Sequence, residues 1–268
     1  MVAALILSAA DRGALEQALD RRIPVRLCDR VDALRSLVTA ASVRVMVSEL
    51  RDRVGASVIP LIGQVASGAA APAIVLRSSL TDAAAGDVIR FAKAGIGARV
   101  SLRGLEGIGD AVVAALGGAV EPRADLAILE RVGPLIPRSL RGFVVLCAVS
   151  SVSRLQVARA ALLLGVGRRT LENRLARASL PAAHRIIGWG VALGAAWQLD
   201  VLDRRPKQVA ASLGFASGAA LANLLARYCG CSATSLREHG GFQAQLERFA
   251  ALFTGGGGAR TVTRRRPA

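Results

Sequence analysis

The feature that most constrains the fold is a change of pattern near residue 120. Before it, short runs rich in β-branched residues alternate with longer stretches whose apolar residues recur at helical spacing. The expected strands are Ala4–Ser8, Val25–Cys28, Val43–Ser48, Ala73–Leu76 and Arg99–Leu102. The expected helices are Asp11–Asp20, Val31–Ala40, Ser57–Ser67, Thr81–Ala94 and Leu105–Leu116. Five such strand–helix units predict an α/β domain over residues 1–118, with a five-stranded parallel sheet and helices on both faces.

After residue 124 the apolar spacing is helical throughout, which predicts an all-α domain over residues 137–240. Gly117-Gly118 and the nearby Pro122 mark the boundary, so residues 119–136 are interpreted as a linker. Pro137 is well placed to open a helix at residues 138–149. Residues 241–268 are expected to form a C-terminal helix and then a flexible basic tail, in which four glycines precede Arg264-Arg265-Arg266.

One local pattern occurs twice in the helical half. Ala161 and Ala210 each stand four residues before a glycine, Gly165 and Gly214, and each glycine is followed by another helical stretch. A small residue where two helices cross, then a tight glycine turn, then a second helix is typical of a helix-turn-helix motif. We therefore expect two such motifs, with their turn glycines 49 residues apart.

The helices of the two motifs follow from capping signals. Ser153 is expected to cap the first helix, with Gln156 as the N3 partner of a capping box, and that helix should run to Leu164. Ser217 is a good N-cap for the last helix. The other helices expected are Arg168–Arg177, Ala182–Leu202, Lys207–Leu213 and Gly218–Tyr228.

Charge is distributed unevenly along the chain, whose net charge is +16. Residues 1–120 hold 14 basic and 11 acidic side chains, whereas residues 121–268 hold 21 and 8. A basic half joined to a nearly neutral half is the pattern expected when one domain binds a polyanion, although a general solubility charge is the alternative. Aromatic residues make up only 3% of the chain, which argues against single-strand binding by base stacking.

The layout of residues 1–118 resembles a response-regulator receiver domain, with a generic flavodoxin-like sheet as the alternative. The resemblance implies a metal-binding acidic pair after the first strand and an aspartate nucleophile after the third. This sequence has the lone Asp11 at the first position and Glu49 at the second, while Arg77 and Arg103 stand near the family's hydroxyl and lysine. Phosphoryl transfer to a carboxylate needs a cation held by several carboxylate oxygens. We therefore predict a pseudo-receiver without phosphorylation, which serves dimerisation or partner contact.

The second motif resembles the DNA-binding domain of the AraC/XylS family. The matching stretches are Ser212-Leu-Gly-Phe-Ala-Ser217, Arg227-Tyr-Cys-Gly230 and Leu236-Arg237, together with the spacing of the two motifs. The resemblance implies a bacterial transcriptional regulator that binds double-stranded DNA. The chain departs from the family at Leu221 and Leu225, which replace aromatics, at Ser232-Ala233, which replaces Thr-Pro, at Gly167, which replaces a serine cap, and at Gly218, Ala219 and Ala220, which replace base-reading residues.

The residues expected to contact DNA lie mostly on the first recognition helix. Arginine can bind guanine and asparagine can bind adenine in the major groove, each through two hydrogen bonds. We predict that Arg168, Arg169 and Asn173 read bases beside Thr170, while Arg174 and Arg177 contact phosphates; the alternative is a solvated helix face. In the second motif, the side chains polar enough to contact DNA are Ser217, Asn223 and Arg227, so that motif is expected mainly to position the protein on the backbone.

Enzymatic and metal chemistry have little support in the sequence. The four cysteines form no CxxC pair, and neither His184 nor His239 lies near a second metal ligand, so we expect no zinc site and no cofactor. No Ser/His/Asp arrangement or carboxylate pair suggests an enzyme. Scattered cysteines fit a reduced cytoplasm, and the apolar run Phe143–Val149 is too short for a membrane span. A cytoplasmic, nucleoid-associated protein with no membrane contact is therefore expected.

The expected partners follow from these assignments. They are double-stranded DNA, RNA polymerase or another regulator, and a second copy of the chain bound through the N-terminal domain. The alternative is a degenerate adaptor that keeps the fold but acts through protein–protein contacts. The second recognition helix has few side chains that could read bases, which favours that alternative. The basic C-terminal half argues against it.

Overall fold

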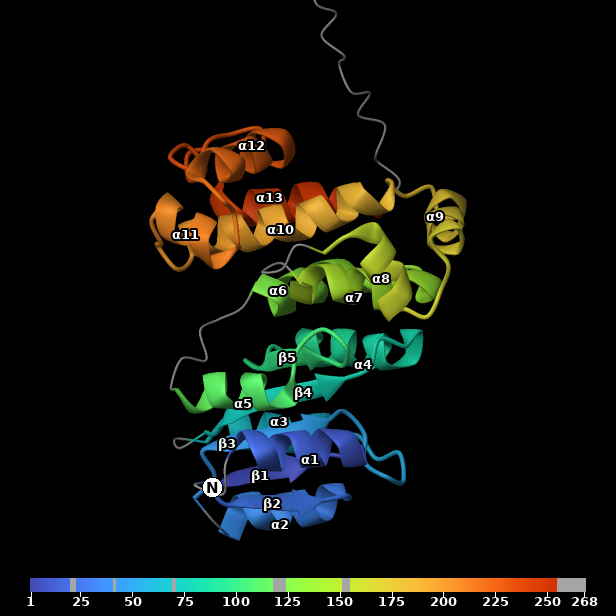
Figure 1. Ribbon diagram of the computed structural model, residues 1–268, viewed down its shortest axis with the longest axis vertical. Helices are drawn as coiled ribbons and strands as arrows, with labels where there is room; N and C mark the ends of the chain where they lie inside the picture. The colour runs from blue at the N-terminus through green and yellow to red at the C-terminus, as the bar shows by residue number, and fades with distance from the viewer. Residues whose placement is uncertain (20–22, 41, 69–70, 118–123, 151–154, 255–268) are drawn as a thin grey trace, which may run out of the picture.

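Five short strands form a parallel sheet at one end of the molecule (Figure 1). The computed structural model describes residues 1–19, 23–40, 42–68, 71–117, 124–150 and 155–254. The strands are β1 (Val2–Leu5), β2 (Val25–Cys28), β3 (Val45–Glu49), β4 (Ala73–Ser78) and β5 (Arg99–Leu102). Their order is β2-β1-β3-β4-β5, and every pair of neighbours is parallel. The predicted α/β fold with a five-stranded parallel sheet is confirmed.

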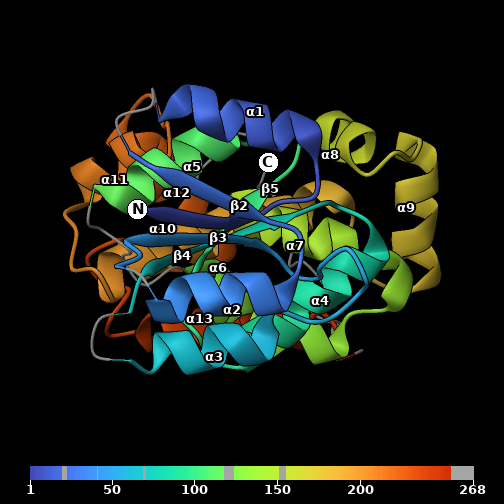
Figure 2. The same ribbon diagram turned by 90° about the horizontal axis from the view of Figure 1, so that it is seen from below.

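Helices cover both faces of this sheet (Figure 2). One face packs against α1 (Ala9–Ala18) and α5 (Ile108–Leu116), and the other carries α2 (Val31–Ala40), α3 (Ile59–Ala66) and α4 (Asp82–Lys93). Alternate strand residues point to opposite faces, so Val2 and Ala4 join the first layer while Ala3 and Leu5 join the second.

The first strand begins and ends earlier than the sequence predicts. The side chain of Ser8 accepts a hydrogen bond from the amide of Asp11 and caps α1. The pairing of β1 with β3 ends at Leu5, and the chain then leads into this cap, so the predicted extension of the strand to Ser8 is wrong.

Helix α4 belongs to two layers at once. It packs against β4, and its other side packs against α6 (Ala124–Val132) and α7 (Arg141–Val149). A Cβ built on Gly133, which begins the short 3-10 helix η1 (Gly133–Leu135), would overlap the side chain of Ile89 on α4. The stretch predicted as a linker therefore includes a helix packed on α4, and one hydrophobic core runs from the sheet into the helical half.

The helical half is built on the long helix α10 (Ala183–Asp200), which lies against α7 and α13 (Gly241–Ala251). A Cβ on Gly190 would lie 2.5 Å from the carbonyl oxygen of Cys147, so glycine allows α10 to cross α7 closely. Among the described residues, no helix has both the length and the apolar character needed to cross a membrane.

Two helix pairs flank α10, each joined by a glycine turn. We call them the first pair, α8 (Val157–Leu163) and α9 (Arg168–Arg177), and the second pair, α11 (Pro206–Ser212) and α12 (Gly218–Tyr228). The turn glycines have positive φ angles, +65° at Gly165 and +71° at Gly214, a conformation that glycine adopts without strain. The first pair lies beside the start of α10 and α11 lies beside its end (Figure 1).

Two details of these helices differ from the sequence predictions. Gln156 stands at the N-cap of α8 and not at its third position, so the predicted capping box is wrong; Ser153 lies outside the described residues. The helix predicted from residue 138 opens as a short 3-10 helix, η2 (Arg138–Leu140), before α7 begins at Arg141. The predicted basic tail, residues 255–268, also lies outside the described part of the chain.

Candidate nucleic-acid interface

Helix α9 has one buried and one exposed face. Leu171 and Leu175 are the buried side, packed into the core four residues apart. The exposed side carries most of the residues predicted to contact DNA, namely Arg168, Arg169, Thr170, Asn173 and Arg177. Gly167 precedes the helix and offers no side chain to cap it. The first turn therefore presents only polar side chains and open backbone N–H groups to solvent.

Arg168 makes a local ion pair on this exposed face. Its Nε lies 2.9 Å from Oε1 of Glu172, one helical turn later. Both side chains are largely exposed, so this pair contributes only about 0.3–0.5 kcal/mol. Arg168 can therefore exchange Glu172 for another acceptor at little cost.

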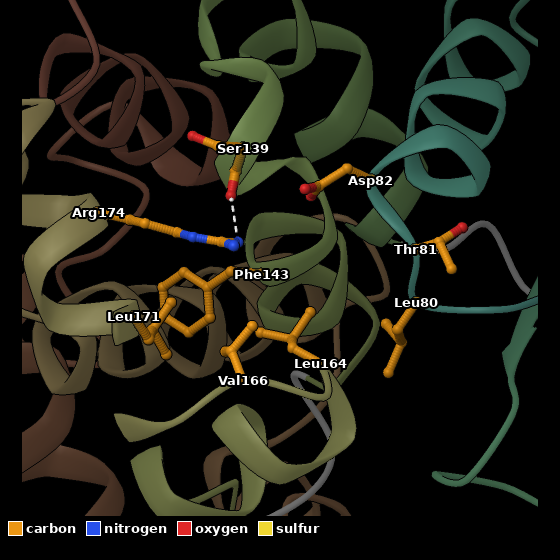
Figure 3. Close-up of a pocket in the computed structure, with 9 residues that line it drawn as sticks. All are labelled: Leu80, Thr81, Asp82, Ser139, Phe143, Leu164, Val166, Leu171 and Arg174. Atoms are coloured by element: carbon orange, nitrogen blue, oxygen red, sulfur yellow. Dashed lines mark hydrogen bonds between the residues drawn. The ribbon is translucent and has the colours of Figure 1, made fainter. Parts of the chain in front are cut away.

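Arg174 differs from the exposed residues of α9 in its burial and in its hydrogen-bond partner. It is half-buried, and its Nη1 donates a hydrogen bond of 3.3 Å to the carbonyl oxygen of Ser139 in η2. The side chain extends into a cavity of about 60 Å³ (Figure 3). The cavity is lined by Leu80, Thr81, Asp82, Ser139, Phe143, Leu164, Val166, Leu171 and Arg174. This residue, predicted to contact phosphate, thus lies where the first pair meets the start of α4.

The second pair presents a different surface. Ser217 caps α12 as predicted, its side chain accepting a hydrogen bond of 3.3 Å from the amide of Ala220. Asn223 and Arg227 are exposed, and the guanidinium carbon of Arg227 lies 5.6 Å from the centre of the Tyr228 ring. Gly218 and Ala219 are exposed as well, so the leading turn of α12 offers few hydrogen-bonding side chains.

Helix α10 contacts both pairs and so fixes the frame in which they lie. Its 18 residues give a length of roughly 27 Å at 1.5 Å per residue. One turn of B-DNA repeats after about 34 Å. The length of α10 is therefore of the same order as one turn of DNA.

A second cluster of functional interest lies at the carboxyl ends of the strands, where the receiver resemblance places a metal. Two arginines surround the single aspartate there: Arg77 binds both oxygens of Asp11, and Nε of Arg103 lies 2.7 Å from Oδ2 of the same carboxylate. Arg103 also donates to Glu49, 2.7 Å away, whose Oε1 accepts the amide of Leu7. Both oxygens of Asp11 and Oε1 of Glu49 are thus occupied by guanidinium groups and backbone.

The electrostatics of this network favour its charged form. Burial alone would raise the pKa of Asp11, but hydrogen bonds from Arg77 and Arg103, together with their positive charges, outweigh burial and lower it. The pKa of Arg103 is raised: burial opposes the shift, and the hydrogen bond to Asp11 and the charge of Glu49 outweigh it. The side chain of Arg77 is only 6% exposed, and it also donates to Ser101 and to the carbonyl oxygen of Glu106.

Sequence reasoning missed the contacts between distant segments. The pairing of Arg103 with Asp11 joins residues 92 positions apart, and that of Arg77 with Asp11 joins residues 66 apart. The sequence did contain one indication: Arg77 and Arg103 stand where a receiver has a hydroxyl and a lysine side chain. Reading those arginines as replacement cations would have predicted the network.

No protein-family model, curated protein or solved structure matches this chain.

Proposed function

We propose that this protein is a sequence-specific regulator of transcription that binds double-stranded DNA, and that its two helix pairs are the helix-turn-helix motifs of an AraC/XylS-type domain. The observation that carries the proposal is the surface of α9. Six polar side chains are exposed on it opposite two buried leucines, on a pair whose turn recurs 49 residues later at a glycine of the same conformation. A polar helix after a tight turn is the form that enters the major groove.

The two motifs divide the work in this proposal. Arg168, Arg169 and Asn173 read base edges beside Thr170, and Arg177 neutralises a phosphate. In the second motif, Ser217, Asn223 and Arg227 hold the protein on the sugar–phosphate backbone. This division rests on the exposed glycine and alanine of the leading turn of α12, which can approach DNA closely but donate no side-chain hydrogen bond.

The α/β domain acts in this proposal as a pseudo-receiver. Arg77 and Arg103 supply beside Asp11 the positive charge that a bound cation would supply, so no phosphoryl group is transferred to this site. The domain instead contacts a second copy of the chain, RNA polymerase or another regulator. Incubation with acetyl phosphate and Mg²⁺ should leave the intact mass unchanged, and an added phosphoryl group on Asp11 or Glu49 would contradict this role.

The decisive experiment is selection from random duplex DNA, followed by measurement of affinity for the enriched sequence at two salt concentrations. A regulator should enrich a defined site and bind it far more tightly than competitor duplex. An adaptor should enrich nothing and show only weak, salt-sensitive association. The alanines of α12 and the uncapped start of α9 favour the adaptor, so enrichment of no sequence would establish it in place of the regulator.

A further inference from the structure

The first pair is seated on the α/β domain, beginning at the loop after β5. Nη2 of Arg159, on α8, donates a hydrogen bond of 3.2 Å to the carbonyl oxygen of Gly104. A Cβ on Gly104 would lie 3.1 Å from a methyl group of Leu163, so α8 rests directly on this loop. Gly104 has a φ of +81°, which a larger residue adopts only with strain.

The loop that carries Gly104 is itself held by the ion-pair network. The amide of Arg103 donates to the carbonyl oxygen of Ser78, 2.9 Å away, and its side chain pairs with Asp11 and Glu49. The acceptor for Arg159 is therefore one residue from an arginine that is held by the ends of β3 and β4 and by the first turn of α1. The first pair thus meets a rigid part of the α/β domain and not a loose turn.

A second set of contacts connects the first pair to the start of α4 through η2 and α7. Arg174 reaches Ser139 in η2 (Figure 3). Asp82 at the first turn of α4 accepts the amide of Gly142, 3.2 Å away. A Cβ on Gly142 would lie 2.6 Å from the carbonyl oxygen of Leu80 and 3.0 Å from Leu164. The α/β domain, α7 and α8 therefore meet at one closely packed point, and Arg174 lies beside it.

We propose that the α/β domain positions the first motif relative to the second, and that Arg159 and Arg174 are the positioning residues. The second pair packs against α10, which fixes it in the helical half, while the first pair takes its position also from Gly104 and from η2. The α/β domain thereby sets the spacing between half-sites that the protein accepts. This inference rests on the proposed DNA binding, and it assigns the half-buried Arg174 a contact within the protein in place of a phosphate.

The test compares the wild type with the double variant Arg159→Ala/Arg174→Ala, and uses Arg177→Ala, an exposed arginine of the same helix, as the matched control. The first measurement is amide hydrogen exchange without DNA. The double variant should exchange roughly tenfold faster in residues 157–177, the factor expected for the loss of a typical hydrogen bond, with no change in α12 and α13. Unchanged exchange in residues 157–177 would overturn the positioning role, whether or not the protein binds DNA.

The second measurement uses duplexes in which two half-sites of the selected sequence are moved apart by single base pairs. The wild type should show a narrow optimum. The double variant should accept at least two further spacings, with affinity for a single half-site within about twofold of wild type. If Arg174→Ala alone weakens single half-site binding as much as Arg177→Ala does, Arg174 contacts phosphate and the assignment is wrong.

Two controls keep these outcomes separate. If the wild type binds no duplex, the proposed function fails, while hydrogen exchange still decides whether the α/β domain holds the first pair. If the double variant does not fold, Arg159→Met and Arg174→Gln replace it: the former keeps the apolar stem without the donor, and the latter keeps a donor too short to reach Ser139. Faster exchange in either supports the inference, and wild-type exchange in both overturns it.

Discussion

The two helix pairs share a turn but differ in how much apolar surface anchors each of them to the core. The first pair buries four small or aliphatic residues, which are Ala160, Ala161, Leu171 and Leu175. The second pair buries a larger set, which includes Val209, Ala210, Leu213, Leu221, Leu225 and Tyr228. Hydrogen bonds from Arg159 and Arg174 add to the attachment of the first pair, and the second pair adds one from Ser212 on α11 to Gln198 on α10. The second pair is thus a continuation of the core, whereas the first is partly attached by hydrogen bonds at its edge.

This difference in packing is consistent with one motif that reads bases and a second that serves mainly as a scaffold. A helix that reads bases must leave its polar face in solvent, so it has fewer apolar residues left to anchor it. A helix that serves mainly as a scaffold can pack more of its surface, and α12 does so through leucines and Tyr228. The proposed reader therefore needs external positioning, and the α/β domain supplies a surface for it.

The largest effect is expected where the second pair joins the core. Tyr228 packs edge-on against Trp189, with ring centres 5.7 Å apart, and lies over Gly188, where a Cβ would overlap its ring. Tyr228→Ala should lower the free energy of unfolding by about 3–5 kcal/mol, the usual cost of removing a buried aromatic ring. Chemical denaturation measures this loss.

Tyr228→Phe is the matched control, because it keeps the ring and should lose less than about 1.5 kcal/mol. A loss below about 1 kcal/mol for Tyr228→Ala would contradict the view that the second pair is part of the core.

The next effect concerns the surface on which the first pair rests. Asp11→Asn leaves Arg77 and Arg103 without their shared carboxylate, and should cost about 3 kcal/mol because a largely buried charge loses its partner. Hydrogen exchange should rise in the first pair more than in the second. The control, Asp29→Asn, removes an exposed partner of Arg53 at 3.7 Å and should cost less than about 1 kcal/mol.

The same network predicts a pH dependence. The folded-state pKa of Asp11 is lowered, so its contribution is complete above the unfolded value of about 3.9 and is lost as the pH falls through the folded value. The free energy of unfolding of the wild type should therefore decline below about pH 4 more steeply than that of Asp11→Asn. Parallel pH profiles for the two proteins would mean that Asp11 does not stabilise the fold in its charged form.

A smaller effect separates the pairs on DNA. Arg169→Ala should lower affinity for the selected site by about 5- to 150-fold, equivalent to about 1–3 kcal/mol, and should relax the preference at one or two base positions. Asn223→Ala, the matched change on α12, should lower affinity less than about threefold and leave the preferred sequence unchanged. Equal losses for the two variants would remove the proposed division between reading and positioning.

Local patterns predicted much of this fold. The bounds of β2, β5, α2, α9 and α12 agree with the sequence predictions, because apolar periodicity, turn glycines and the Ser217 cap act within a few residues. The start of α8 was wrong for the same reason: Gln156 fits a capping box in sequence, but the helix begins one residue after it. A capping motif shows that a residue can cap a helix, but it does not fix the residue at which the helix begins.

Local sequence patterns could not predict the contacts between residues that lie far apart in the sequence. Nothing near Arg103 in the sequence indicates Asp11 as its partner, and nothing near Arg159 indicates Gly104. The dual role of α4 was hidden as well, because an amphipathic pattern shows that a helix is buried but not that a second layer covers it. These contacts place Arg174 at a cavity. The helical pattern of α9 alone had predicted that this arginine lies on the DNA-binding face.

The smallest effect tests the polar face of α9 itself. Glu172 is the single carboxylate on α9 and pairs with Arg168 at its exposed side, whereas α12 has no acidic residue. Glu172→Gln should change the free energy of unfolding by less than about 0.5 kcal/mol, because the pair is exposed. It should nevertheless raise DNA affinity about two- to fivefold, since it releases Arg168 and removes repulsion from phosphates, and the gain should shrink as salt screens the charges. Glu238→Gln removes an exposed carboxylate elsewhere and controls for net charge. An equal gain in affinity from that variant would show that DNA affinity follows the total charge of the protein, and that Glu172 has no local effect on α9.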